Sequence, residues 1–250
     1  MKKLKRKLNE IRQEVIFSFR SWKMALLQNP QSVAHLNPNI KLSSRWYGST
    51  YGGFYVYPDY LHAQSIVYSV GIGKDISFDR KIIQNHGCKV FAFDPTPKSI
   101  QYLAELNLPS EFIFHPWGLA VQSGPQTFYL PKDDRGVSGS REMNHAVDAQ
   151  KSIEVEMKSL PDLMKFLGHS HIDLLKIDIE GSEYEVIKDV LNRSITINQV
   201  LIEFHDRFFN TDEPRSRATI QLMHEAGYHI FAASRNKEEI SLIHERMLTS

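Results

Sequence analysis

The sequence predicts an α/β fold: a doubly wound, mostly parallel, Rossmann-like sheet of seven strands with a C-terminal antiparallel hairpin and an N-terminal helical extension. Apolar runs alternate with helical stretches from residue 65 onward, which is typical of such a sheet. Gly71-Ile-Gly73 follows the first run as a tight strand-to-helix turn. Only residues 234–239 separate the last two runs, which is too short for a parallel crossover, so these strands must pair antiparallel.

Composition limits the chain to one domain of this type with an extension. It has 250 residues, of which 42% are hydrophobic. Its formal net charge of +1 provides no overall positive electrostatic field that would attract nucleic acid. The single cysteine, Cys88, excludes an intramolecular disulfide and a cysteine-cluster metal site. We find no apolar run of about 18 residues and no signal-peptide pattern, so we expect a cytoplasmic protein.

Residues 1–58 form the predicted extension, and residues 59–250 form the domain. Apolar residues recur every three or four positions over 4–26, which predicts an amphipathic helix. Five basic residues lie within the first seven. This combination suits peripheral contact of residues 1–27 with an anionic membrane, while packing on the domain or on a second subunit in an oligomer is the simpler alternative.

The remaining elements are predicted in chain order from apolar runs and helical periodicity. The runs that read as strands are 65–70, 88–93, 111–115, 126–130, 152–157, the run from 173, 199–205, 228–233 and 240–244. Helices are expected from the glycine turn to about 86 and over 98–107, 182–191 and 217–226. The polar segment 133–150 has no periodicity and reads as a lid, a substrate loop or disorder.

The glycine turn and Asp94 predict a nucleotide site. The turn allows a ligand to approach the backbone at a helix N-terminus, and Asp94 ends the next strand 21 residues on (94 minus 73), where a carboxylate can bind ribose hydroxyls. Ile76 occupies the place of the third glycine of a dinucleotide fingerprint. The alternative is an ordinary turn, with Asp94 capping the segment 95–98.

Trp117 and Leu119 follow the third strand at the same sheet edge. Their side chains are candidates to flank a purine ring, although aromatic residues at this place also serve in a core or a lid.

Acids end the next strand. Lys176, Asp178 and Glu180 share one face by the period of two, and the carboxyl ends of such strands face the ligand site. The structural alternative is a Lys176–Asp178 pair whose carboxylate caps the helix 182–191.

Glu203 and His205 share a face at the end of the strand 199–205. A histidine there can accept a proton near neutral pH, but it can equally be a structural residue.

These motifs carry a family resemblance. Leu174-Leu-Lys-Ile-Asp-Ile-Glu-Gly-Ser-Glu183, Leu201-Ile-Glu-Phe-His205 and the upstream Ser159-Leu-Pro-Asp-Leu resemble the signature of FkbM-type methyltransferases over about residues 65–205. The resemblance implies a class I methyltransferase fold, in which a terminal hairpin is expected. It also implies transfer of a methyl group from S-adenosylmethionine, commonly to a hydroxyl of a sugar or another small metabolite.

One position departs from the family pattern. Ser69 stands where the family often has an acid, two residues before the first glycine, and Asp75 is expected to take over the contact with the methionine amino group. The residues expected to hold the cofactor are Gly71, Ile72, Gly73, Asp75, Asp94, Pro95, Trp117 and Leu119.

Three residues are expected to act in catalysis. Asp178 is placed beside methionine and acceptor, and His205 or Glu180 is expected to act as the base or to orient the acceptor. We assign no metal ligand from the sequence, because carboxylates alone do not favour a divalent cation bridging Asp178, Glu180 and the acceptor over the metal-free site.

Two other functions are weighed. A nicotinamide-dependent oxidoreductase is disfavoured by the missing third glycine and by the hairpin. A non-catalytic methyltransferase-like scaffold, in which the helix 4–26 is the working part, would bind the cofactor without turnover. The sequence does not name the small-molecule acceptor.

Overall fold

A computed structural model describes residues 22–23, 26, 29–133 and 139–248. Apart from Trp22, Lys23 and Leu26, the amphipathic helix predicted over 4–26 lies outside this range, as does the basic cluster. No helix within the described ranges is both long and apolar enough to cross a membrane.

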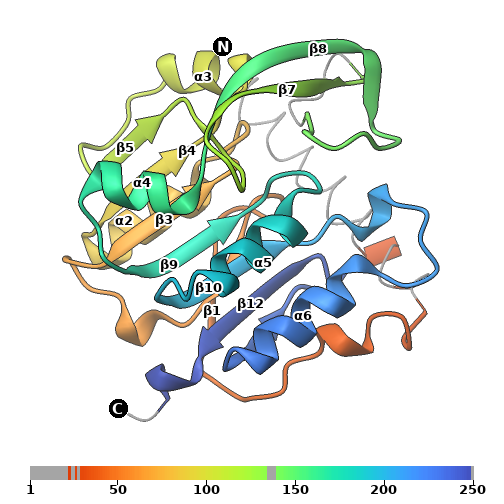
Figure 1. The fold of residues 1–250 in the computed structure, drawn as a ribbon. Helices are drawn as coiled ribbons and strands as arrows, with labels where there is room; N and C mark the ends of the chain where they lie inside the picture. The colour runs from red at the N-terminus through yellow and green to blue at the C-terminus, as the bar shows by residue number, and fades with distance from the viewer. Residues whose placement is uncertain (1–21, 24–25, 27–28, 134–138, 249–250) are drawn as a thin grey trace, which may run out of the picture.

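A mostly parallel sheet forms the centre of the molecule, so the predicted α/β class is confirmed (Figure 1). In spatial order its seven strands are β11 (Tyr228–Ala233), β12 (Glu239–His244), β10 (Ile197–Glu203), β9 (Ile172–Ile177), β3 (Ile66–Val70), β4 (Lys89–Phe93) and β5 (Phe112–His115). Strand β12 alone is antiparallel to its neighbours β10 and β11. The parallel strands therefore end together at one edge, the carboxyl edge of the sheet.

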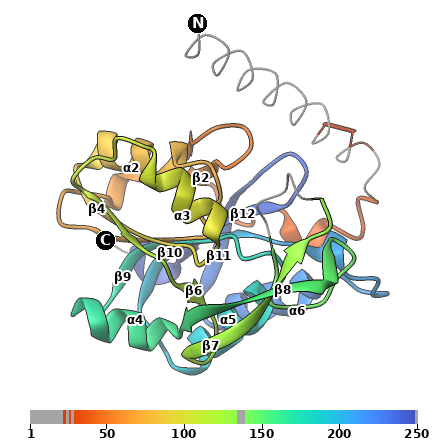
Figure 2. The same cartoon turned by 90° about the horizontal axis from the view of Figure 1, so that it is seen from above.

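Helices cover both faces of the sheet (Figure 2). One face packs against α4 (Leu160–Leu167), α5 (Glu183–Asn192) and α6 (Arg215–Glu225). The other packs against α2 (Ser77–His86), α3 (Pro97–Ala104) and a strand pair, β1 (Arg45–Tyr47) and β2 (Phe54–Val56). Short 3-10 turns are η1 (Ala34–Leu36), η2 (Pro58–Tyr60), η3 (Asp206–Phe208) and η4 (Glu245–Met247).

The β1–β2 pair joins the segment before residue 58 to the core. Phe54 and Val56 are buried in the same apolar cluster as α2 and the sheet. Ser241 on β12 donates a hydrogen bond to the Tyr55 carbonyl oxygen. The domain boundary predicted at residue 58 therefore separates residues that share one core.

A second, smaller sheet extends beyond the carboxyl edge (Figure 1). It consists of β6 (Gly118–Leu119), β8 (Val147–Lys158) and β7 (Gly124–Pro131), in that order. Its own core is small and contains Ala120, Phe128, Val155 and Met157. Because β8 begins at Val147, the loop predicted over 133–150 is shorter than expected at its C-terminal end.

Sequence reasoning missed helix α4. The Ser159 side chain caps it by accepting from the Asp162 backbone N–H, and Gly168 ends it in the left-handed conformation. We treated Ser159–Leu163 only as a lead-in to the acid motif. The eight-residue helix is too short for a clear periodicity, but the cap and the glycine were visible signals.

Candidate functional site

A cavity of about 800 Å³, its open mouth included, lies at the carboxyl edge of the central sheet. It brings together most of the residues that the sequence singled out: Gly71, Ile72, Gly73, Asp75, Asp94, Pro95, Leu119, Asp178 and Glu180. Topology alone accounts for this gathering, because these residues follow neighbouring parallel strands.

The glycine turn is held from two sides. The Gly71 backbone N–H donates to the Phe93 carbonyl oxygen at 2.9 Å, and Lys176 Nζ donates to the Gly71 carbonyl oxygen at 2.8 Å. Lys176 thus binds the turn, in contrast to the Lys176–Asp178 pair of the structural alternative. The buried lysine fixes the backbone that faces the cavity.

Asp94 shapes the same turn. Its Oδ2 accepts from the backbone N–H groups of Ile72 at 3.0 Å and Gly73 at 2.8 Å. Its Oδ1 accepts from the backbone N–H and the hydroxyl of Thr96, at 2.8 and 2.6 Å. The carboxylate therefore connects the glycine turn to the start of α3, and any ribose contact shares oxygens that already accept these bonds.

Asp75 lies just before α2 and not inside it. Its Oδ1 accepts from the Ser77 backbone N–H, which caps the helix, and its Oδ2 accepts from the Ser49 hydroxyl. The neighbouring Tyr51 and Gly52 line the cavity beside it. The segment before the domain thus supplies one wall, which sequence reasoning missed because it assigned residues 1–58 to an extension outside the domain.

Trp117 does not reach the cavity lining. Its ring stacks on His115, with 4.8 Å between centroids, and meets Phe166 of α4 edge-on at 5.0 Å. Residues 117 and 119 both follow β5, yet only Leu119 lines the cavity. The structure therefore gives Trp117 a packing role and leaves Leu119 as a candidate neighbour of a purine.

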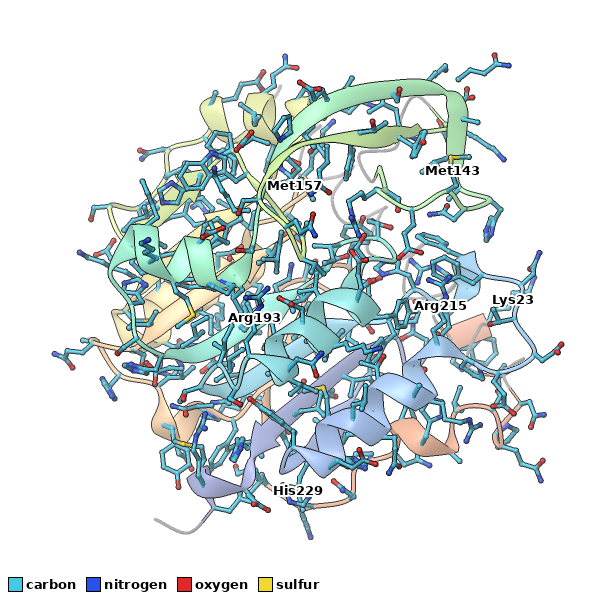
Figure 3. All side chains as sticks on the ribbon, in the orientation of Figure 1. Lys23, Met143, Met157, Arg193, Arg215 and His229 are labelled. Carbon is cyan, nitrogen blue, oxygen red and sulfur yellow. The ribbon has the colours of Figure 1, made fainter. Side chains whose placement is uncertain are left out.

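The small sheet supplies an apolar wall. Leu119, Phe128 and Met157 face the cavity, and Figure 3 shows Met157 near the base of β8. Sequence reasoning named neither Phe128 nor Met157, because it predicted strands over 126–130 and 152–157 but assigned no ligand contact to either. The alternation of apolar residues along both strands was the available signal.

Arg141 brings a cation to the cavity from the segment predicted as a lid or substrate loop. Its guanidinium forms an ion pair with Glu185 on α5. Arg215 holds the same segment through its Nη1, which contacts Glu142 Oε2 at 2.8 Å (Figure 3). These two ion pairs hold the described part of the loop next to the cavity.

Asp178 and Glu180 form the acidic end of the cavity. Burial raises the pKa of Asp178 to about 6; Lys176 opposes this shift and Glu180 adds to it. Glu180 adopts a left-handed backbone conformation with φ of 55°, which is uncommon for a residue with a side chain. Such strain is typical of functional sites.

His205 lies behind this acidic end, beyond the cavity lining. Its side chain is fully buried, and its Nδ1 contacts Glu183 Oε1 on α5. Its Nε2 faces Glu180 Oε2 at 3.3 Å, Glu203 Oε1 at 3.5 Å and Asp178 Oδ1 at 3.7 Å. Burial by itself lowers the pKa of His205, but the Glu183 and Glu180 carboxylates outweigh it and hold that pKa well above the usual value.

The convergence of His205 on three acids was not foreseen. Asp178, Glu203 and His205 offer ligand atoms that all lie within 4.8 Å of one another, which is the geometry of a possible cation site. The sequence had shown Glu203 and His205 on one face, but their distance from Asp178 is set by the pairing of β9 with β10, which residue spacing does not give.

Comparison with known proteins identifies the family. The model described as "Methyltransferase FkbM domain" matches residues 65–230. The chain belongs to the FkbM methyltransferase family. The match includes every strand of the central sheet up to the start of β11. It also includes the acidic residues at the strand ends, Asp94, Asp178 and Glu203.

Two further proteins are similar in sequence to this chain. "Probable methyltransferase-like protein 24" of Homo sapiens is 27% identical over 144 residues, which are 57% of this chain and 33% of that protein. "Hexuronic acid methyltransferase AglP" of Haloferax volcanii is 28% identical over 131 residues, 49% of this chain and 52% of that protein. The chain thus spans about a third to a half of these relatives.

A solved structure also aligns with this FkbM-family chain. The fibrillarin pre-rRNA processing protein of Methanococcus jannaschii superimposes with a TM-score of 0.44 and 12% identity, covering 74% of this chain and 68% of that one.

Proposed function

We propose that this protein transfers the methyl group of S-adenosylmethionine to a hydroxyl of a sugar or another small metabolite. The observation that carries the proposal is one cavity lined by two chemically different groups of residues. The glycine turn with Asp94 is one group, here called the glycine end, and Asp178 with Glu180 is the other, the acidic end; the two groups meet where Gly71 approaches Asp178. Membership of the FkbM family supports methyl transfer as the reaction.

The glycine end is the cofactor end. Gly71, Ile72 and Gly73 present backbone to the cavity, and Asp94 fixes their orientation. Asp75 lies beside the turn, where a carboxylate suits the amino group of the methionine moiety. Leu119 and the apolar wall of the small sheet suit a purine ring.

The acidic end is the acceptor end. A sulfonium methyl is already an activated electrophile, so the protein has to align oxygen, methyl carbon and sulfur and to remove the hydroxyl proton. The acceptor O–H bond breaks and its proton passes to Glu180, which lines the cavity, while His205 lies behind Glu180 with Nε2 3.3 Å from its Oε2 and helps to orient that carboxylate. The oxygen–carbon bond forms as the carbon–sulfur bond breaks, leaving S-adenosylhomocysteine. Asp178 faces the sulfonium or the acceptor hydroxyl.

Arg141 favours an acceptor that carries a negative charge. Arg141 lines the cavity from the loop side; its Nη2 pairs with Glu185, and its remaining N–H groups suit a carboxylate. A relative that methylates a hexuronic acid supports the same class of acceptor. We therefore place uronic acids first among candidate acceptors and neutral sugars second.

The activity test uses the full chain with S-adenosylmethionine and a panel of uronic acids, neutral sugars and simple diols. Formation of S-adenosylhomocysteine and of a methylated product is the expected result. Calorimetry with S-adenosylmethionine and with nicotinamide cofactors runs in parallel. Binding of a nicotinamide cofactor alone would favour the oxidoreductase, and cofactor binding without turnover over the whole panel would favour the scaffold.

Asp94→Ala is expected to weaken S-adenosylmethionine binding at least tenfold. It removes the acceptor of four hydrogen bonds, so the Ile72 and Gly73 N–H groups lose the partner that orients the turn. Calorimetry measures the affinity, and circular dichroism checks the fold. Unchanged affinity in a folded variant would exclude Asp94 from the cofactor site.

A deoxyribose analogue of the cofactor separates two roles of Asp94. If the carboxylate contacts the ribose, the analogue loses affinity for the wild type but not further for Asp94→Ala. If Asp94 acts only by holding the turn, the penalty of the analogue is the same in both proteins.

A further inference from the structure

Three potential metal ligands converge behind the acceptor end of the cavity. Asp178 follows β9, Glu203 ends β10, and His205 lies two residues further on. Their ligand atoms lie within 4.8 Å of one another. Ligands bound at about 2.0–2.2 Å to one cation lie about 3 to 4.4 Å apart, so the cluster is close to a coordination sphere as it stands.

The His205 ring is oriented as a metal-ligating histidine is. The fully buried Glu183 carboxylate contacts Nδ1, and its other oxygen accepts from the Gly181 backbone N–H at 2.8 Å. When an ion takes the place of the Nε2 proton, a carboxylate on Nδ1 keeps the remaining proton on that nitrogen and leaves the Nε2 lone pair for the ion. That nitrogen points at the carboxylates of Asp178, Glu180 and Glu203.

Two buried atoms in the cluster lack a hydrogen bond. Within the described residues, His205 Nε2 and Asp178 Oδ1 have no hydrogen-bond partner, although acids lie 3.3–3.7 Å from the nitrogen. Buried polar atoms without a partner are rare and call for an explanation. One cation between them would satisfy both.

The charge of the side chains around His205 also favours a cation. Four carboxylates, those of Asp178, Glu180, Glu183 and Glu203, surround one imidazole. Arg207 reaches Glu203 at 3.4 Å but is also paired with Glu238, and Lys176 donates to Gly71. A divalent cation would offset the excess of negative charge.

We propose that Asp178, Glu203 and His205 Nε2 bind a divalent first-row transition-metal ion, with Glu183 as the residue that positions His205. One nitrogen and two carboxylate ligands suit Mn²⁺, Fe²⁺ or Zn²⁺ better than Ca²⁺, which prefers oxygen ligands alone. Three protein ligands leave coordination positions open.

The proposed ion deepens the proposed function and rests on it for its role. Asp178 belongs to both the metal cluster and the cavity, so an ion held by it would lie next to the acceptor and could bind an acceptor oxygen. An acceptor oxygen bound there becomes more acidic, and its proton passes to Glu180 at the cavity edge. His205 is then a ligand rather than the base, and acceptors with two neighbouring oxygens, such as hydroxy acids and diols, are favoured.

Mn²⁺ is the probe for the binding test. The full-length protein is stripped with a chelator, and the loss of the free Mn²⁺ electron paramagnetic resonance signal is followed in a titration. We expect one ion per chain. His205→Gln and Glu203→Gln should each weaken binding at least tenfold. Glu183→Gln should weaken it about 10- to 100-fold, because an amide facing Nδ1 favours the wrong tautomer.

Glu238→Gln is the matched control. Glu238 shares Arg207 with Glu203 but lies outside the metal cluster, so this variant should bind Mn²⁺ as the wild type does. Circular dichroism checks the fold of each variant. Wild type that binds no Mn²⁺, or that binds it equally well in His205→Gln and Glu203→Gln, overturns the proposal.

A second measurement needs only the wild type, so it tests the proposal even if the variants do not fold. Electron spin-echo modulation from ¹⁴N is expected on bound Mn²⁺, since an imidazole nitrogen is a ligand; its absence overturns the proposal. Calorimetry with S-adenosylmethionine on the same chelator-treated protein distinguishes failure of the metal site from failure of the proposed function. Cofactor binding without Mn²⁺ binding defeats the metal site only, and Mn²⁺ binding without cofactor binding defeats the proposed function.

Discussion

Gly71→Ala is expected to destabilise the fold by more than about 3 kcal/mol and to abolish cofactor binding. At φ of 81° a side chain is strained, and the new Cβ would overlap the Asp178 carbonyl oxygen. The Asp178 backbone N–H donates to the Val70 carbonyl oxygen, so it cannot retreat without breaking the contact between β3 and β9. Urea unfolding measures the stability, and calorimetry measures cofactor affinity.

Gly73→Ala is the control for this prediction. Gly73 also has a positive φ, of 55°, but a Cβ there meets no atom within 4 Å. The expected cost is only about 1 to 2 kcal/mol, from the left-handed conformation alone. Equal losses of stability in the two alanine variants would show that close approach to Asp178 is not what requires glycine at position 71.

Asp178→Asn is expected to lower turnover roughly a hundredfold, the largest effect among the carboxylates of the cavity. The amide keeps the shape and removes the charge that faces the sulfonium or the acceptor. Turnover at saturating cofactor measures the effect, with S-adenosylhomocysteine as the product. Wild-type rates in this variant would move the reaction centre away from β9.

Stability distinguishes this role from a structural one. The folded-state pKa of Asp178, about 6, lies above its ordinary value of 3.8, so the folded protein binds a proton there more tightly than the unfolded chain does. Ionisation of Asp178 therefore lowers the free energy of unfolding, and this loss is fully present above pH 6. Asp178→Asn should raise or preserve the melting temperature of the metal-free protein at pH 8 while it lowers turnover. A lower melting temperature would indicate a structural carboxylate.

Turnover of the wild type should also depend on pH. Protonation of Asp178 below about pH 6 removes its charge, so turnover should fall there. Asp178→Asn should lose this part of the pH profile and keep the rest.

Much of the site follows from the order of elements in the sequence. Gly71, Asp94 and Asp178 each end a strand of a parallel sheet, and parallel strands end at one edge, so their meeting needs no knowledge of side-chain packing. The antiparallel β11–β12 pair followed in the same way from the short segment between them.

Other parts depended on contacts between distant segments. Tyr51 reaches the cavity because β2 packs beneath the sheet, and no local pattern in 29–58 encodes that packing. Trp117 was expected at the purine, but stacking on His115 turns its ring to the α4 side. The contact between Glu183 and His205 joins α5 to the end of β10 and is invisible to the spacing of either residue.

The small sheet has a consequence for access to the cavity. Its core contains only Ala120, Phe128, Val155 and Met157, whereas the central sheet is covered by a large core on each face. A unit with so few buried contacts opens at a lower free energy than the whole domain. Amide protons of β7 and β8 should therefore exchange with solvent sooner than those of β3 and β9. Since Phe128 and Met157 line the cavity, the same opening that exposes those amides should also open the cavity wall, so local unfolding of this hairpin should limit how long a cofactor placed there stays enclosed.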